Sequence, residues 1–121
     1  MSMRPAMLHR WSDLTTDAPM PMLDRKRIIG DQMMLSLVHL NKGCVVPMHV
    51  HANEQFAYIL RGWLRFTIGD KAKGNLQVLD VRADEVLHLP GNVPHAAEAM
   101  ADTIVLDCFS PPSATTGIDR K

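Results

Sequence analysis

The sequence predicts an all-β domain, because short β-type runs alternate with turn signals along most of its length. The turns are rich in Gly, Asn and Asp, and no long stretch keeps the 3.6-residue period of an amphipathic helix. Many short strands with regular turns are typical of a β-sandwich or barrel. The expected strands are Arg25–Ile29, Gln32–Leu40, Val45–His51, Gln55–Leu60, Trp63–Ile68, Leu76–Val81, Glu85–Leu89, His95–Ala99 and Thr103–Phe109.

The chain length fits a single domain with flanking segments. It has 121 residues, and a domain of this size buries roughly two-thirds of the surface that its unfolded chain exposes. We expect an extended, Met- and Pro-rich N-terminal arm over residues 1–24, a β-barrel over residues 25–112 and a polar tail over residues 113–121.

Charge and composition exclude several classes of partner. Thirteen Lys and Arg balance thirteen Asp and Glu, so there is no electrostatic case for nucleic acid or an anionic membrane. No signal-peptide pattern opens the chain and no apolar run approaches the ~20 residues of a membrane span, so the expected compartment is the cytoplasm. Cys44 and Cys108 are too few for a disulfide framework, and we expect both to be buried free thiols.

A histidine pattern in the middle of the chain indicates a metal site. His49 and His51 are two residues apart, and in a strand such residues point to the same face. Gln55 follows four residues later, and His95 enters from a Pro-flanked turn. Three neutral imidazoles and an amide oxygen form an uncharged ligand set that suits one divalent ion such as Zn, Ni, Fe or Mn.

Such a site leaves the bound metal its full positive charge and leaves coordination positions open to water or substrate. The plain alternative is a polar patch in the mouth of the barrel that holds no metal. The agreement between the spacing and the turn context favours the metal site.

The stretch from Gly43 to Gly62 resembles the first motif of the cupin superfamily, G-x5-H-x-H-x3,4-E-x6-G. Both glycines and the two histidines match, and Gln55 stands where the glutamate is expected. Glu54 is one position early. Neighbours in a strand point to opposite faces, so Glu54 and Gln55 are not expected both to face the metal. The resemblance implies that Gln55 is the ligand, because many small cupins with an H-x-H-x-x-E-Q pattern use the glutamine.

The second cupin motif, G-x5-P-x-G-x2-H-x3-N, is matched at Pro90 and His95. Asp84 and Asn92 replace its two glycines, and Ala99 replaces its final asparagine. Asp and Asn adopt left-handed turn conformations more readily than other non-glycine residues. The resemblance implies a double-stranded β-helix, or jelly-roll barrel, with the metal inside one mouth, and a homodimer.

A narrower resemblance, to the small pectin- and alginate-degradation cupins, is carried by the run D-T-I-V-L-D-C-F-S-P-P and the preceding E-V-L-H-L-P-G-N-V-P-H. Those enzymes open 4,5-unsaturated uronates to linear ketouronates. The resemblance implies that Asp107 is a general acid and base, that Gln55 orients the substrate or completes the metal shell, and that Phe109 lines the substrate pocket. Period-two alternation also places Asp107 and Phe109 on one face of their strand.

One departure bears on the substrate. That family tends to carry an arginine shortly after S-P-P, where this chain has Ser113. Arginine suits a substrate carboxylate because its donors form a bidentate fork. The substitutes that the sequence offers are Arg25, Arg27, Arg61 and Arg65.

The leading hypothesis is therefore a metal-dependent enzyme acting on a small oxygenated metabolite, with uronate ring opening as the specific reaction. The alternatives are a metal-dependent dioxygenase and a non-catalytic module that binds a small molecule.

Overall fold

The computed structural model describes residues 3–115 and contains ten strands and two one-turn 3-10 helices. The strands are β1 (Asp17–Met20), β2 (Leu23–Ile29), β3 (Met34–Leu40), β4 (Val45–His49), β5 (Glu54–Arg61), β6 (Trp63–Ile68), β7 (Gln77–Arg82), β8 (Val86–Leu89), β9 (His95–Ala99) and β10 (Thr103–Ser110). The helices are η1 (Trp11–Asp13) and η2 (Lys71–Lys73).

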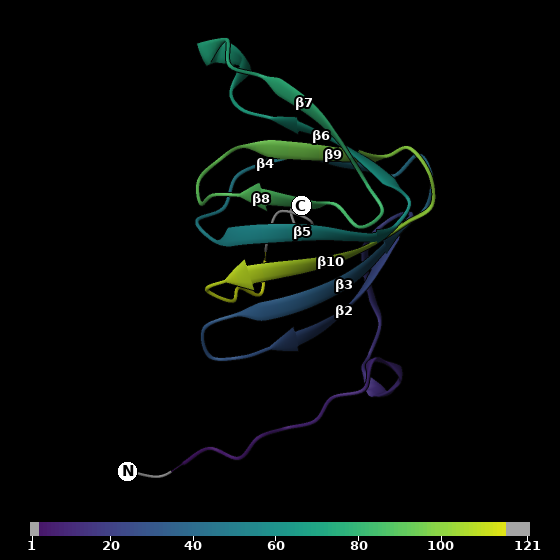
Figure 1. Cartoon of the computed structure of the whole chain (residues 1–121), viewed down its shortest axis with the longest axis vertical. Helices are drawn as coiled ribbons and strands as arrows, with labels where there is room; N and C mark the ends of the chain where they lie inside the picture. Colours follow the sequence, from purple (N-terminus) through teal and green to yellow (C-terminus); the bar gives the residue numbers. More distant parts are fainter. Residues whose placement is uncertain (1–2, 116–121) are drawn as a thin grey trace.

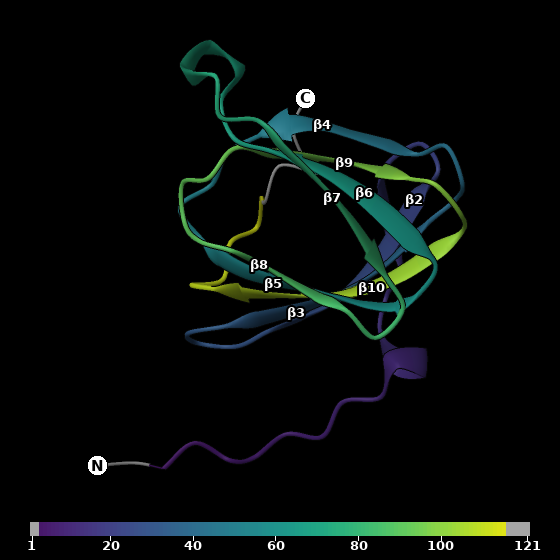
Figure 2. The ribbon, with the colours of Figure 1, turned by 45° about the horizontal axis from the view of Figure 1, so that its top comes forward.

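The strands form two antiparallel sheets that face each other (Figures 1 and 2). The six-stranded sheet has the order β1-β2-β3-β10-β5-β8, and the four-stranded sheet has the order β4-β9-β6-β7. Strands far apart in the sequence are neighbours in both sheets, as β10 between β3 and β5 shows. This is the all-β jelly-roll barrel that the sequence predicts.

Alternation along the strands builds the core. In β10 every second residue from Thr103 to Phe109 is buried, and the residues between them face outward. The core contains side chains from both sheets, among them Val38, Ile59, Leu64, Phe66 and Val105. It fills the barrel behind the end at which the chemistry-bearing residues gather.

Two tight turns explain why the second cupin motif can carry other residues in place of its glycines. Asp84 and Asn92, which replace glycines, adopt φ angles of +67° and +66°. This is the left-handed region that these two residue types accept best after glycine, so the motif keeps its backbone path. At Gly62 no replacement fits, because a Cβ atom there would lie 2.4 Å from Thr103 Oγ1 and φ is +107°.

The structure corrects three of the sequence expectations. Strand β1 and the first two residues of β2 lie within the predicted arm of residues 1–24, because Leu23 packs into the core and β1 forms a short edge. Strand β4 ends at His49, so His51 lies in the following loop rather than in the strand. Cys44 is buried, but Cys108 is only half-buried, because it points outward from β10.

The residues before η1 leave the barrel as an extended arm (Figures 1 and 2). At the other end of the chain, the predicted polar tail lies outside the described residues from position 116 onward. Neither of the short helices in the described part of the chain is long and apolar enough to span a membrane.

Candidate metal centre

Three histidines converge at one end of the barrel. His49 ends β4, His95 begins β9, and the two are direct cross-strand partners. His51 reaches the same place from the loop before β5. The ring centroids of His49 and His95 are 4.3 Å apart, and those of His51 and His95 are 4.9 Å apart. One ligand atom from each residue lies within 4.8 Å of the other two, which is close enough for all three to hold one ion.

Backbone carbonyls orient all three rings. The Nδ1 atom of His49 is 2.8 Å from the Pro47 carbonyl, that of His51 is 3.1 Å from the Asn53 carbonyl, and that of His95 is 2.9 Å from the Val93 carbonyl. A carbonyl only accepts, so each Nδ1 carries the proton and each Nε2 presents a lone pair. This is the tautomer that metal-ligating histidines need.

The carbonyl anchors were not predicted, although each lies two residues from its histidine. The sequence contains no signal for them, because any residue type supplies the carbonyl.

Gln55 and Asp107 lie on the opposing wall, on β5 and β10. Gln55 Nε2 donates a 2.9 Å hydrogen bond to Asp107 Oδ1, and both side chains are buried. Glu54 points the other way and pairs with His88 outside the barrel. The structure therefore places Gln55 inside and Glu54 outside, on the opposite faces that strand alternation requires.

Burial shifts the titration of two groups in the site. It lowers the pKa of His95 to about 4, an effect that the neighbouring His49 and His51 increase and the hydrogen bond to Val93 opposes. His95 is therefore neutral near pH 7, as a ligand must be. Burial also raises the pKa of Asp107 to about 7, against the opposing effect of the Gln55 hydrogen bond.

The cavity between the two walls measures about 40 Å³. A water molecule needs roughly 10–15 Å³ on this measure, so the cavity is larger than a site for one water molecule. Its polar lining residues are His49, Gln55, His95 and Asp107, and its other eight lining residues are apolar. Phe109 is one of these and lies edge-on to His51, with ring centroids 5.7 Å apart.

None of the four candidate arginines lines this cavity. Arg25 is buried but makes a bidentate ion pair with Asp17, and Arg65 pairs with Asp80 on the outside of the four-stranded sheet. Arg27 donates to the Ala114 carbonyl, and Arg61 is exposed. Among the described residues, the predicted replacement for the carboxylate-binding arginine is therefore not found.

Asn53 is a buried polar residue that sequence reasoning missed. Its side-chain amide donates to the Pro111 carbonyl, and its own carbonyl anchors His51. It thus ties the His51 loop to the segment that follows β10. An asparagine in a short connection reads as an ordinary turn residue, so the sequence gives no sign of this role.

A jelly-roll barrel with three converging imidazoles in one mouth defines a class of small β-barrel proteins with a candidate histidine-based metal site. The comparison with known families gives the class its name. Residues 36–109 match the cupin domain family, which is more than half of the chain. The chain belongs to the cupin family.

A curated relative and several solved structures are similar to this chain. Oxalate decarboxylase OxdC of Bacillus subtilis (strain 168) is 27% identical over 78 residues, which is 64% of this chain. The chain spans about a fifth of that relative's length.

Among solved structures, KdgF from Halomonas sp. superposes with a TM-score of 0.77 at 21% identity, covering 91% of this chain and 97% of KdgF. A structure of Bacillus subtilis oxalate decarboxylase, a protein with Mn(II) centres, superposes with a TM-score of 0.81 at 20% identity, covering 95% of this chain and 32% of that one. At these identities the structural likeness shows the fold.

The residues present fit a metal ion. His51 Nε2 and Gln55 Oε1 are buried and have no hydrogen-bond partner within the described residues. Buried polar atoms are rarely left unsatisfied, so two such atoms in one site suggest that a ligand completes it. His49, His51 and His95 would hold the ion, and Gln55 would supply the amide oxygen.

Proposed function

We propose that this cupin is a metal-dependent enzyme that moves protons on a small oxygenated metabolite. The observation that carries the proposal is the place of Asp107, the only carboxyl group among the cavity-lining residues. It lies on β10, on the wall opposite His49 and His95, with Phe109 two residues further along the same face.

A metal ion at the three histidines would polarise a substrate oxygen. Asp107 is the group that would take a proton from the bound substrate and return it at another atom. The hydrogen bond from Gln55 Nε2 holds the Asp107 carboxyl and leaves the buried Gln55 Oε1 atom without a partner among the described residues. Phe109 and the apolar lining exclude water from the reacting atoms.

The first reaction to test is the ring opening of 4,5-unsaturated uronates. The sequence likeness to the pectin- and alginate-degradation cupins supports it. The structural likeness to KdgF supports only the fold in which the reaction would take place. The reaction is a proton-transfer isomerisation, which is the chemistry that Asp107 is placed to perform.

The test is to incubate the protein with unsaturated galacturonate and to follow the absorbance of its conjugated alkene. The proposal predicts that the absorbance disappears with the wild type and persists with Asp107→Asn. Persistence with the metal-loaded wild type would reject the uronate reaction.

The apolar lining favours a second candidate, a dioxygenase of a small organic substrate. Eight of the twelve lining residues are apolar, and none of the twelve is Lys or Arg. Such a pocket suits the hydrocarbon part of a phenol or a diketone better than the hydroxyls of a sugar acid. Oxygen uptake with a phenolic or diketone substrate would support this candidate, and tight ligand binding without turnover in either assay would indicate a binding module.

A further inference from the structure

His51 is the one candidate histidine ligand that no strand holds. His49 ends β4 and His95 begins β9, and the pairing of these two strands fixes both residues. His51 lies in the connection between β4 and β5, residues 50–53, which we call the ligand loop. A loop side chain keeps its position only through the contacts of its own loop. These contacts therefore determine whether the third imidazole can reach an ion.

On one side the ligand loop packs against the turn that precedes β9. The His51 carbonyl accepts a 2.8 Å hydrogen bond from the Asn92 backbone N–H. A Cβ atom at Gly91 would lie only 2.5 Å from the Ala52 carbonyl oxygen, so the two backbones touch with no room for a side chain. The same turn leads into β9 and His95, so it aligns two of the candidate ligands with each other.

On its other side the ligand loop is held by the side chain of Asn53. The amide nitrogen Nδ2 donates a hydrogen bond to the Pro111 carbonyl, in the segment that follows β10. The backbone carbonyl of Asn53 lies 3.1 Å from His51 Nδ1, and the residue is only 6% exposed. A buried amide donor needs an acceptor, and this one has found it outside its own loop. One buried residue therefore links a ligand ring to the end of the six-stranded sheet.

The segment after β10 is itself fixed on both sides of that carbonyl. Before it, Ser110 ends β10, and its Oγ atom donates a 2.7 Å hydrogen bond to the Gln32 carbonyl. After it, the Arg27 guanidinium donates a 3.0 Å hydrogen bond to the Ala114 carbonyl. Because the acceptor lies between two anchors, the hydrogen bond from the ligand loop holds the loop rather than the segment.

We propose that Asn53 is a positioning residue of the metal centre, whose side chain holds His51 where the third imidazole can reach the ion. The proposal rests on the metal site of the proposed function. Removal of the Asn53 amide would leave His49 and His95 in their paired strands and would release only His51. Groups that orient a metal ligand without touching the metal typically change metal affinity by about 10–100-fold, and we expect an effect of this size.

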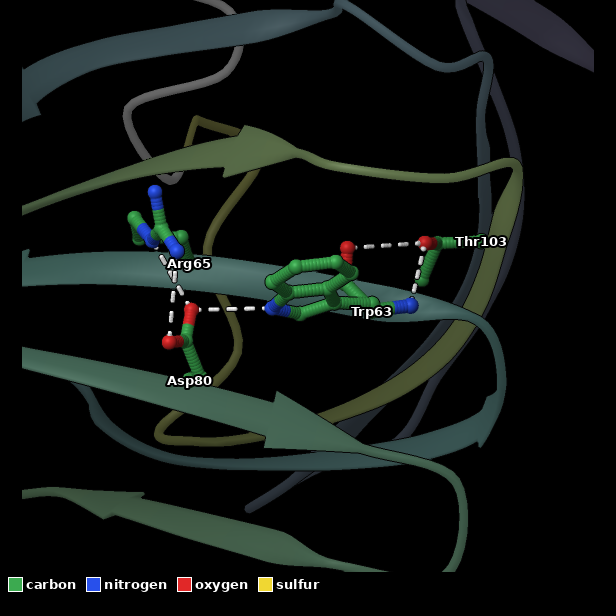
Figure 3. Close-up of polar contacts among 4 residues, drawn as sticks. All are labelled: Trp63, Arg65, Asp80 and Thr103. Carbon is green, nitrogen blue, oxygen red and sulfur yellow. Dashed lines mark hydrogen bonds and ion pairs between the residues drawn. The ribbon is translucent and has the colours of Figure 1, made fainter.

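Thr103 offers a matched control at the other end of the barrel. Like Asn53 it is buried, and its Oγ1 atom accepts a 3.0 Å hydrogen bond from the Trp63 backbone N–H (Figure 3). The same hydroxyl donates a 2.8 Å hydrogen bond to the Ala101 carbonyl. Thr103 begins β10 and Ser110 ends it, which separates the two sites by roughly 24 Å at ~3.4 Å per residue. Thr103→Ala therefore removes buried hydrogen bonds without touching a candidate ligand.

The test is a titration of the metal-free wild type, Asn53→Ala and Thr103→Ala with Zn²⁺ in competition with a chromophoric chelator. Circular dichroism would verify that each protein is folded and give its melting temperature. Both variants should melt at a lower temperature than the wild type, because each loses a buried hydrogen bond. Only Asn53→Ala should lose Zn²⁺ affinity, by about 10–100-fold, whereas Thr103→Ala should keep the wild-type affinity.

Gly91→Ala tests the ligand loop from its other side. The added methyl group would push the Ala52 carbonyl and shift the loop while the Asn53 side chain stays intact. Zn²⁺ binding should weaken in this variant as well. An unchanged Zn²⁺ affinity in a folded Gly91→Ala variant would contradict the role assigned to the loop contacts.

A further readout needs no metal. Two-bond ¹H–¹⁵N correlations in NMR spectra of the metal-free protein report which ring nitrogen of each histidine carries the proton. We expect the form protonated on Nδ1 for His49, His51 and His95 in the wild type and in Thr103→Ala. In Asn53→Ala, His51 alone should lose that single form. A loss of fold would instead affect all three rings.

Two results would overturn the proposal alone. One is a wild type that binds Zn²⁺ no more tightly than folded Asn53→Ala, and the other is an equal loss of affinity in Asn53→Ala and Thr103→Ala. A wild type that takes up no Zn²⁺ would overturn the metal site itself, and the role of Asn53 with it.

Discussion

The two sheets of this barrel contribute different chemistry to the same cavity. The four-stranded sheet contributes His49 and His95. Backbone carbonyls orient their rings so that both could hold a metal. The six-stranded sheet contributes Gln55, Asp107 and Phe109, an amide, a carboxyl and a ring. In the proposed function, two of the imidazole ligands lie on one wall and the proton-transferring Asp107 lies on the other, with Gln55 beside Asp107. Substitutions on the two walls should therefore have separable effects.

The outer faces of the two sheets differ as well. Paired charges occupy the middle of the four-stranded sheet, whereas leucines and aromatic rings occupy the middle of the six-stranded sheet. Both sheets bury a similar apolar interior, so the two sheets differ on their outer faces and not in the core that they share.

The largest separable effect is expected at Asp107. Asp107→Asn should lower the rate of the proposed proton transfer by about 100-fold or more, because an amide cannot exchange the proton. Metal content, measured by elemental analysis, should stay at the wild-type level. Loss of the metal together with activity would contradict the division between the walls.

A smaller effect is expected at Gln55. Gln55→Ala removes the buried Oε1 atom and should weaken metal binding by about 10-fold. The effect is moderate because the three imidazoles would still hold the ion. A competitive chelator titration measures this change. Val38→Ala, a truncation deeper in the same cavity, is the control and should leave metal affinity unchanged.

The smallest effect is expected on the outside of the four-stranded sheet, at Asp80. The hydrogen bond from Arg65, with that from Trp63, lowers the pKa of Asp80 below its ordinary value of 3.8. A lowered pKa means that the ionised carboxylate stabilises the fold above pH 3.8 and that this contribution is lost as the pH falls below it. Asp80→Asn should lower the melting temperature at pH 7 by about a few degrees at most.

Melting temperatures of the wild type and Asp80→Asn measured at low pH provide the control. As the pH falls below 3.8, the difference between wild type and Asp80→Asn should shrink toward zero, because both side chains are then neutral. A difference that grows in acid would show that the sign is wrong.

Most of the fold could be predicted because short strands and turns leave a strong local signal. The expected bounds of β6 and β9 agree with the structure, and the other predicted strands shift by one to a few residues. The missed strand was β1, whose Asp17-Ala-Pro-Met sequence has poor strand propensity and pairs only along an edge.

The convergence of the three histidines could be predicted because spacing and motif agree, although the strand is shorter than expected. Same-face alternation assumed that His49 and His51 share a strand, and the strand ends at His49. The loop, anchored by the Asn53 carbonyl, brings His51 to the site instead.

The apolar residues on the outside of the six-stranded sheet could not be predicted from the sequence. Strand β10 is apolar on both of its faces, so alternation alone does not reveal that Leu106 and Cys108 lie on the outside. Only the cross-strand register shows that such residues form continuous rows.

The central claim, that His49, His51 and His95 hold a metal, is tested most directly by elemental analysis of protein purified without added metal. The account predicts about one divalent ion per chain for the wild type and almost none for a folded His49→Ala/His51→Ala variant. A folded double variant that keeps the full metal content would contradict it.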